Sequence, residues 1–283
     1  MNIFKVSMVG ANEALPGADV AEFLRGHPLA EIGVGVSKDK GGTSDDFGPT
    51  LRYCYVINLQ KKLLKIRERT PDVGTLGIHV NGKDRRDKKS WPYMVLTGNG
   101  DLPKALGDML DFPNTSIQIN FSNIDVPLTA ADTLLTANPG RRGGVILPSG
   151  ASGITYNPSN MRVVLPYDER TKPFVKRVYM NLLRTKFAFR PDILYDASHG
   201  LGVVAKGYSP PRFKELRQGY AGGLGVDNIG DELEKIAAAQ TDRDVQIYID
   251  AEGKLKIGTV LDLGLAEKFY KNIMYWVKNN RKR

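Results

Sequence analysis

The stretches YDASHGLG, Tyr195–Gly202, and GYAGGLGVDNI, Gly219–Ile229, lie about one strand-and-helix unit apart in the chain. The first ends an apolar run in the carboxylate of Asp196 and then continues into glycines. The second places Gly222 and Gly223 just before an expected helix start, where backbone N–H groups and the positive end of a helix favour an anion. One strand ends in an acid, and the next ends in a glycine turn of the kind that binds phosphate. This arrangement indicates an active site in an α/β protein.

Around these stretches, short apolar runs alternate with helical patterns from end to end. Strands are expected over Phe4–Val9, Glu31–Ser37, Thr75–Val80, Ser116–Phe121, Gly144–Leu147, Ile193–Asp196, Gly219–Ala221 and Val245–Asp250. Helices are expected over Ala18–Arg25, Val56–Arg69, Leu102–Leu110, Phe174–Leu182, from a cap at Asp227 through Ile236, and over Leu265–Trp276. Several strands are continuously apolar, as in a parallel sheet buried on both faces. About eight strand-then-helix units in succession favour a single (β/α)8 TIM barrel over residues 1–283. A doubly wound open sheet is the alternative.

Three stretches read as loop insertions on this barrel, near residues 38–50, 82–91 and 138–166. The last is rich in Gly, Pro and Asn. A hairpin or a lid is one interpretation of it, and a plain surface connection is the other.

The bulk composition narrows the class of protein. The chain has 283 residues and a net charge of +9, which favours acidic partners such as phosphates or nucleic acid. The basic residues are dispersed and not interleaved with aromatic ones, so nucleic acid is the less favoured partner. No run is apolar and long enough to span a bilayer, and the chain enters a strand-like run directly, so neither membrane insertion nor a secretory signal is expected. Cys54 is the one cysteine, which favours a reducing, cytoplasmic location.

In a (β/α)8 barrel the functional residues lie at the carboxyl ends of the strands. Asp196 is there a candidate proton donor, or else a structural carboxylate bonded to nearby N–H groups. Gly222 and Gly223 form either a phosphate cradle or a tight turn that needs glycine. His79 ends the third expected strand and either lines the site or has a structural role, and His199 is an equal candidate in the loop after Asp196. No metal-ligand spacing, P-loop or nucleophile elbow occurs in the sequence, so no metal or cofactor is expected.

Taken together, these motifs resemble the phosphoribosylanthranilate isomerase family, a (β/α)8 barrel of amino-acid biosynthesis. The match lies in five segments in the family's order: Leu51–Tyr53, Ile78–Gly82, Ile193–Gly202, Ala221–Ile229 and Asp250–Gly253. The resemblance implies an acid/base isomerisation of a phosphorylated sugar or nucleotide-like small molecule. Asp196 would be the acid, and Arg52 would hold a substrate carboxylate. Gly222, Gly223, Gly253 and Asn228 would bind the phosphate.

The chain departs from the family at two of these positions. The family's base is a cysteine on the first strand, and the matching position here is Ser7, a much weaker base than a thiolate. On the eighth strand, Glu252 stands where the family has a small hydroxyl residue, and its charge would oppose a phosphate unless Lys254 or Lys256 offsets it. The alternative function is therefore a non-catalytic barrel that binds or sequesters a phosphorylated ligand. Oligomeric state is not indicated by the sequence.

Overall fold

The computed structural model describes residues 1–37, 43–44, 48–49, 51–82, 90–97, 106, 108–109, 112, 115–121, 124–133, 145–146, 155–156, 162–184, 190–196, 202–213, 215–240 and 246–280. Most of the three expected insertions, and His199, lie outside these residues.

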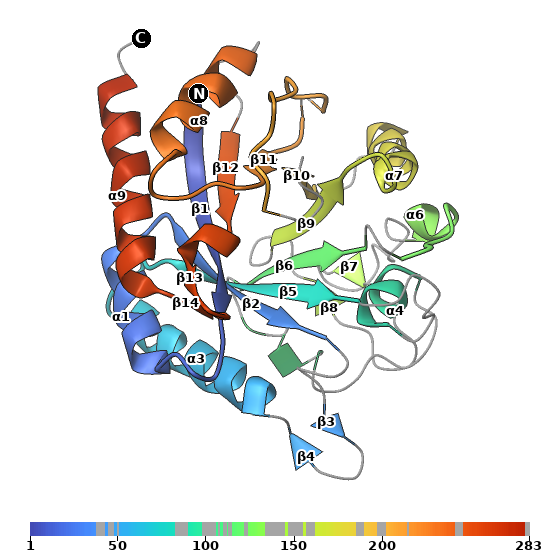
Figure 1. Ribbon diagram of the computed structural model, residues 1–283. Helices are drawn as coiled ribbons and strands as arrows, with labels where there is room; N and C mark the ends of the chain where they lie inside the picture. Colours follow the sequence, from blue (N-terminus) through green and yellow to red (C-terminus); the bar gives the residue numbers. More distant parts are fainter. Residues whose placement is uncertain are drawn as a thin grey trace. The chain divides into compact units, whose positions relative to one another are not determined.

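Eight parallel strands form the sheet, in the order β1-β12-β11-β10-β9-β6-β5-β2, and this order closes into a barrel (Figure 1). The strands are β1 (Asn2–Ala11), β2 (Ala30–Val36), β5 (Thr75–Asn81), β6 (Thr115–Asn120), β9 (Arg162–Tyr167), β10 (Asp192–Asp196), β11 (Gln218–Ala221) and β12 (Gln246–Ala251). The expected (β/α)8 barrel is thereby confirmed, and the open sheet is excluded.

The remaining described elements are helices and three small hairpins. The helices are α1 (Gly17–Gly26), α3 (Leu51–Arg67), α4 (Trp91–Thr97), α6 (Ala130–Thr133), α7 (Lys172–Arg184), α8 (Ile229–Ala239), α9 (Leu263–Asn280) and the 3-10 turn η1 (Gly253–Leu255). The hairpins pair β3 (Thr43–Ser44) with β4 (Gly48–Pro49), β7 (Val145–Ile146) with β8 (Thr155–Tyr156), and β13 (Lys256–Ile257) with β14 (Val260–Leu261). None of the described helices is long and apolar enough to cross a membrane.

The fifth barrel strand is not the one that the sequence predicts. Gly144–Leu147 was expected in the barrel, but Val145–Ile146 forms a hairpin with Thr155–Tyr156 instead. The barrel strand is β9, which lies within the stretch interpreted as the third insertion and pairs with β6 from Arg162 to Val164. Pro166 makes this strand hard to predict from the sequence, because proline cannot donate a ladder hydrogen bond and usually argues against a central strand. On the side that faces β6, Pro166 lies beyond the last paired residue, Val164.

The chain divides into two compact units, and each contributes a set of barrel strands. One unit is Met1–Val34, Lys61–Thr75 and Ile193–Arg283. The other is Gly35–Gln60 and Leu76–Asp192.

In the first unit, β1 is the central strand between β12 and β2. Its register passes through Ser7↔Asp250 on one side and Ser7↔Glu31 on the other. On the neighbouring strands, Gly219 makes room for a large side chain: a Cβ at Gly219 would lie 2.1 Å from the Tyr248 ring. The ring of Tyr248 is almost wholly buried and fills the space that this glycine leaves, so the pair acts as one packing unit.

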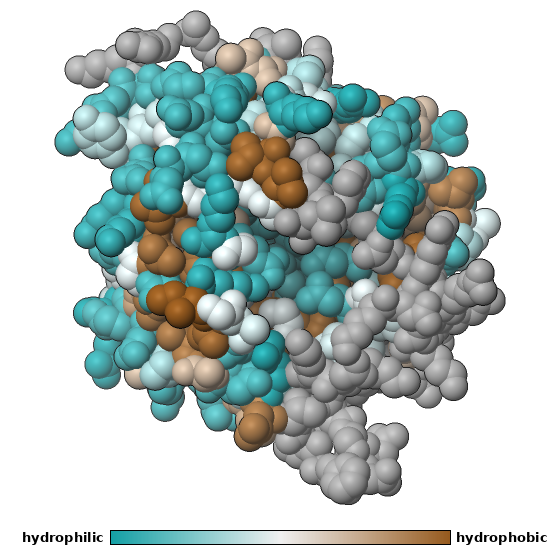
Figure 2. Space-filling model, in the orientation of Figure 1, coloured by the Kyte–Doolittle hydropathy of each residue, from teal (hydrophilic) through white to brown (hydrophobic). Residues whose placement is uncertain are grey.

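Helices α8 and α9 pack on one another in this unit, and α9 runs along β1 (Figure 1). The buried stripe of α9 includes Ala266, Phe269, Ile273 and Val277 at helical spacing. Trp276 lies at its edge and donates from Nε1 to Glu234 of α8 at 2.7 Å. On the face seen in Figure 2, apolar residues show as separate patches in a largely hydrophilic surface.

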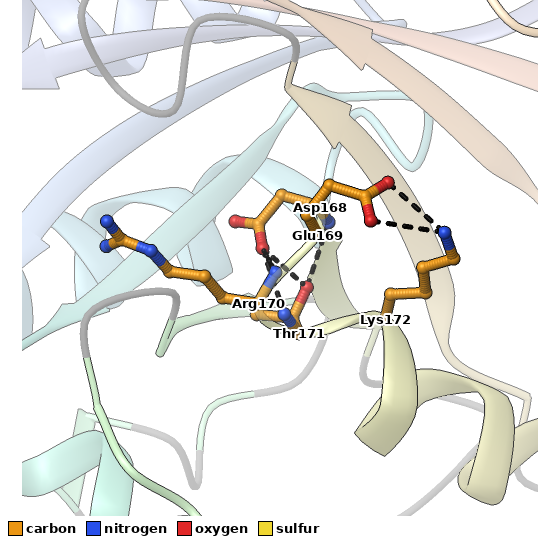
Figure 3. A network of polar contacts seen from close by, with 5 residues as sticks. All are labelled: Asp168, Glu169, Arg170, Thr171 and Lys172. Atoms are coloured by element: carbon orange, nitrogen blue, oxygen red, sulfur yellow. Dashed lines mark hydrogen bonds and ion pairs between the residues drawn. The ribbon is translucent and has the colours of Figure 1, made fainter.

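In the second unit, the turn from β9 into α7 shows how a helix starts directly after a barrel strand. Asp168 accepts hydrogen bonds at Oδ1 from the backbone N–H groups of Arg170 and Thr171, at 2.7 and 2.9 Å (Figure 3). Its own N–H donates to the Thr171 hydroxyl at 2.9 Å. The exposed Glu169 and Lys172 form an ion pair beside this turn. These bonds order the turn of residues 168–171 that leads from β9 into α7.

Candidate functional site

The carboxyl ends of β10 and β11 bring the predicted acid and the glycine turn together. Asp196 is in register with Ala221, the residue directly before Gly222. Gly222 and Gly223 both have positive φ, 106° and 61°, a backbone conformation that side chains oppose. A Cβ at Gly223 would also lie 2.4 Å from the backbone nitrogen of Val204. The glycine pair is thus required by the turn itself and by the segment that packs on it.

Asn228 braces this turn from the start of α8. Its Oδ1 accepts from the N–H of Gly225 at 2.8 Å, and its Nδ2 donates to the carbonyl of Gly223 at 3.0 Å. The helix begins at Ile229, with Asn228 at the cap position, so the expected cap at Asp227 is wrong. The side-chain amide of Asn228 thus holds the glycine loop in shape with both its oxygen and its nitrogen. In this way it would position the backbone N–H groups for an anion bound at the loop.

The segment after β10 is tied down on the same side of the unit. The Tyr208 hydroxyl donates to Glu232 of α8 at 2.8 Å, and the Tyr220 hydroxyl donates to the carbonyl of Ser209 at 2.9 Å. Burial raises the pKa of both tyrosines, so both hydroxyls keep their protons and act as donors. The Tyr195 hydroxyl accepts from the backbone N–H of Arg212 at 3.1 Å. These contacts hold the segment that carries Val203 and Val204 against Gly223.

A second acidic position of the site lies on β12, beside the predicted base position. Ser7 is 1% exposed and its register partner Asp250 is 7% exposed. Burial raises the pKa of Asp250 to about 7, the facing Ser7 hydroxyl lowers it, and the nearby carboxylates of Glu252, Glu31 and Asp196 raise it further. A carboxyl with this pKa can both take and give a proton near neutral pH.

Glu31 is a third buried acid in this unit, 3% exposed within the apolar strand β2. Thr75 donates to its Oε2 at 3.2 Å. Among the described residues, no three His, Cys, Asp or Glu side chains are grouped so as to hold a metal ion.

The positive charge expected to offset Glu252 is present. Lys256 donates to Glu252 Oε1 at 2.6 Å, and the stem of Lys254 packs where a Cβ at Gly225 would lie. Gly253 opens η1, and a Cβ there would meet nothing within 4 Å. Packing therefore does not require glycine at position 253, in contrast to Gly223.

In the second unit, the strand ends carry carboxamides. Gln118 donates to Asn120 Oδ1 at 3.0 Å, and Asn120 donates to Asn81 Oδ1 at 2.7 Å. Asn81 in turn donates to the carbonyl of His79 at 3.1 Å. His79 is on β5 and 3% exposed. Each of these three side-chain amides donates a hydrogen bond to the next acceptor, so their orientations are fixed relative to one another.

Arg52 is the second residue of α3, where the sequence places a substrate-binding guanidinium. Its Nη1 donates to the carbonyl of Gly35 at 2.6 Å. This bond fixes one edge of the planar guanidinium fork.

The sequence motifs do not single out Asp250 or Glu31. A carboxylate within or at the end of an apolar strand is the signal that would have identified both, since an acid is rarely buried without a role or a partner. The described structure brings Ser7, Asp196, Gly222, Gly223, Asn228 and Gly253 into the first unit, and His79 and Arg52 into the second.

No family model matches the chain, and no curated protein does. Among solved structures, the chain is similar to N-(5'-phosphoribosyl)anthranilate isomerase from Pyrococcus furiosus, with 13% identity over 96% of this chain and 99% of that one, at a TM-score of 0.42. It is also similar to a Rubisco-like protein from Rhodopseudomonas palustris, with 11% identity over 97% of this chain, 64% of that one and a TM-score of 0.42. The closed order of eight parallel strands in the chain itself assigns it to the (β/α)8 barrels.

Proposed function

We propose that the chain is an enzyme of the phosphoribosylanthranilate isomerase type, which acts by acid/base isomerisation on a phosphorylated sugar or nucleotide-like small molecule. The observation that carries this proposal is the juxtaposition of Asp196 with the Gly222–Gly223 turn through the register of β10 and β11. It puts a proton-transferring group next to a turn whose glycines permit the close approach of an anion.

The roles follow from the chemistry of each group. The backbone of Gly222 and Gly223, held by Asn228, would receive the phosphate at the start of α8. Gly253 would add its N–H from the next strand end. Asp196 would protonate the sugar ring oxygen as the ring opens.

Two residues of the second unit would also have a role, as the family resemblance implies. Arg52, whose Nη1 donates to the carbonyl of Gly35, would hold a substrate carboxylate. His79 would line the site beside the carboxamides of Asn81 and Asn120.

Turnover of N-(5'-phosphoribosyl)anthranilate tests the proposal directly, followed by the change in fluorescence of its anthranilate group. The variant Asp196→Asn is expected to lose at least about 100-fold in kcat, as the loss of a general acid does. It should keep the rise in melting temperature that the wild-type chain shows with ribose 5-phosphate. Wild-type turnover in this variant would contradict the role of Asp196.

The alternative is a barrel that binds a phosphorylated ligand without converting it, and Ser7 in place of the family's cysteine favours it. In that case ribose 5-phosphate would raise the melting temperature, and the isomerase substrate would stay unchanged. If no phosphorylated compound shifts the melting temperature, both functions are wrong. Retention on nucleic acid with a steep salt dependence would then favour the partner that the charge of +9 suggests.

A further inference from the structure

The register partners Ser7 and Asp250 leave two polar atoms without a well-formed hydrogen bond. Ser7 Oγ and Asp250 Oδ1 are both buried, and neither has a hydrogen-bond partner among the described residues. Buried polar atoms are nearly always paired, so two such atoms on neighbouring strands call for an explanation. Ser7 and Asp250 are register partners on β1 and β12, and the Ser7 hydroxyl favours the ionised form of the Asp250 carboxyl.

The surroundings of Asp250 supply acids from three other positions. The charges of Glu252 after its own strand, Glu31 on β2 and Asp196 on β10 all raise the pKa of Asp250. Of these acids, Glu252 forms an ion pair with Lys256. Ser7 is the register partner of both Asp250 and Glu31, so its buried hydroxyl lies on the strand between two acids. A buried cluster of this kind is a candidate for exchanging protons with a ligand.

We propose that Asp250 is the group that removes the substrate's C–H proton, and that Ser7 is its positioning residue. This inference rests on the proposed function and adds to it the base that Ser7 alone cannot provide. A serine hydroxyl has no tendency to take up a proton near neutral pH, whereas a carboxylate does. The hydroxyl of Ser7 can donate to the carboxylate of Asp250 and hold it in one orientation.

The proton transfer balances without a further reactant. The C–H bond beside the imine carbon of the ring-opened substrate breaks, and the proton goes to Asp250, which becomes a carboxylic acid. The electron pair of that bond forms the C=C bond of an enolamine, and the imine electrons neutralise the protonated nitrogen. The enolamine then tautomerises to the aminoketone, and Asp250 returns its proton to water.

The pKa of Asp250, near 7, supports this role separately from the geometry. A base acts only when ionised, so turnover should rise with pH through about 7. Because Ser7 lowers this pKa, its removal should move the rise to higher pH.

The test compares Asp250→Asn, Asp250→Glu, Ser7→Ala and the control Asp72→Asn with the wild-type chain, using N-(5'-phosphoribosyl)anthranilate. Asp250→Asn should lose at least about 100-fold in kcat with little change in KM, and Asp250→Glu should recover part of the loss. Ser7→Ala should lose less and shift the midpoint of the pH profile upward. Asp72 is exposed and outside the proposed machinery, so its variant should behave as the wild type.

The outcomes separate this inference from the proposed function. An active wild-type chain whose Asp250→Asn variant is equally active overturns the role of Asp250 alone. If the pH profile of Ser7→Ala is not shifted upward, the role of Ser7 is wrong. A wild-type chain that converts no substrate overturns the proposed function and this inference together. Should Asp250→Asn fail to fold, the Asp250→Glu rate and the Ser7→Ala profile decide.

Discussion

At the scale of single residues, the site depends on backbone conformations and burial that neighbouring segments impose. Gly223 combines a φ of 61° with a backbone only 2.4 Å from where a Cβ would lie, so no other residue fits. Gly253, matched to the same phosphate role by sequence, has open space around it. The two glycines have the same expected role, but the fold requires glycine at position 223 and does not require it at position 253.

Asp250 makes the stability of the chain depend on pH in a predictable direction. Its pKa is raised to about 7 in the folded chain from an ordinary value of 3.8, chiefly by burial. The folded chain therefore binds this proton more tightly than the unfolded chain does, and stability is lost as pH rises from about 4 to about 7. A shift of this size corresponds to up to about 4 kcal/mol, reduced by any relaxation around the charge.

The variant Asp250→Asn removes this ionisation, so its free energy of unfolding should fall less between pH 5 and pH 8 than that of the wild type. Urea unfolding at the two pH values measures the difference. Asp227→Asn serves as the control, because its carboxylate is exposed and should leave the wild-type pH dependence in place. Equal slopes for the wild type and Asp250→Asn would show that Asp250 is ionised normally.

The sequence identifies Asp196 and the glycine turn because their signals are local: an apolar run ending in an acid, and glycines before a helix. The environment of Asp250 is not local. It depends on the register that sets Ser7, Asp250 and Glu31 side by side, and three strands distant in sequence create it. Asn228 was expected to bind phosphate directly, but its two hydrogen bonds to the glycine loop are visible only once that loop has its shape.

At the scale of elements, β9 shows how a strand can be held where its sequence is unfavourable. Arg162, at the start of β9, forms a buried ion pair with Asp192, at the start of β10. The Asp192 side chain is 0% exposed and that of Arg162 is 10% exposed. The pattern of short apolar runs predicts seven of the barrel strands well, but it favours Gly144–Leu147 over a strand that contains both an arginine and a proline. A long-range ion pair is absent from any local pattern, so the fifth strand is missed.

Removing one partner of this pair should destabilise the chain strongly, because the other charge stays buried without its partner. Asp192→Asn is expected to lower the free energy of unfolding by about 3 kcal/mol. The matched control is Asp132→Asn, which breaks the exposed pair with Arg177 and should have a much smaller effect. Urea unfolding of both variants decides the point: similar losses would mean that the buried pair contributes no more than an exposed one.

At the scale of the whole molecule, the barrel is shared between two compact units. The strands β10, β11, β12 and β1 with most of β2 belong to the first, and β5, β6 and β9 belong almost entirely to the second. Neither set closes a barrel by itself, and an open set would expose the unpaired edges of its outer strands. We therefore expect the chain to unfold as one domain.

The two tryptophans of the chain test this expectation, since Trp91 belongs to the second unit and Trp276 to the first. The single-tryptophan variants Trp91→Phe and Trp276→Phe each report on one unit. For each variant, the midpoint of the fluorescence transition in urea is compared with the midpoint that circular dichroism gives for the same variant. The two midpoints should coincide in both variants. Two separate midpoints would show that the units unfold independently.

The packing of Tyr248 over Gly219 has an evolutionary consequence. A side chain at position 219 and a large ring at position 248 cannot occupy the barrel together, since the added Cβ would lie 2.1 Å from the ring. Divergent relatives should therefore change the two positions in concert, a larger residue on β11 accompanying a smaller one on β12. Such paired changes would identify descendants of this barrel at distances where the short glycine motifs no longer do.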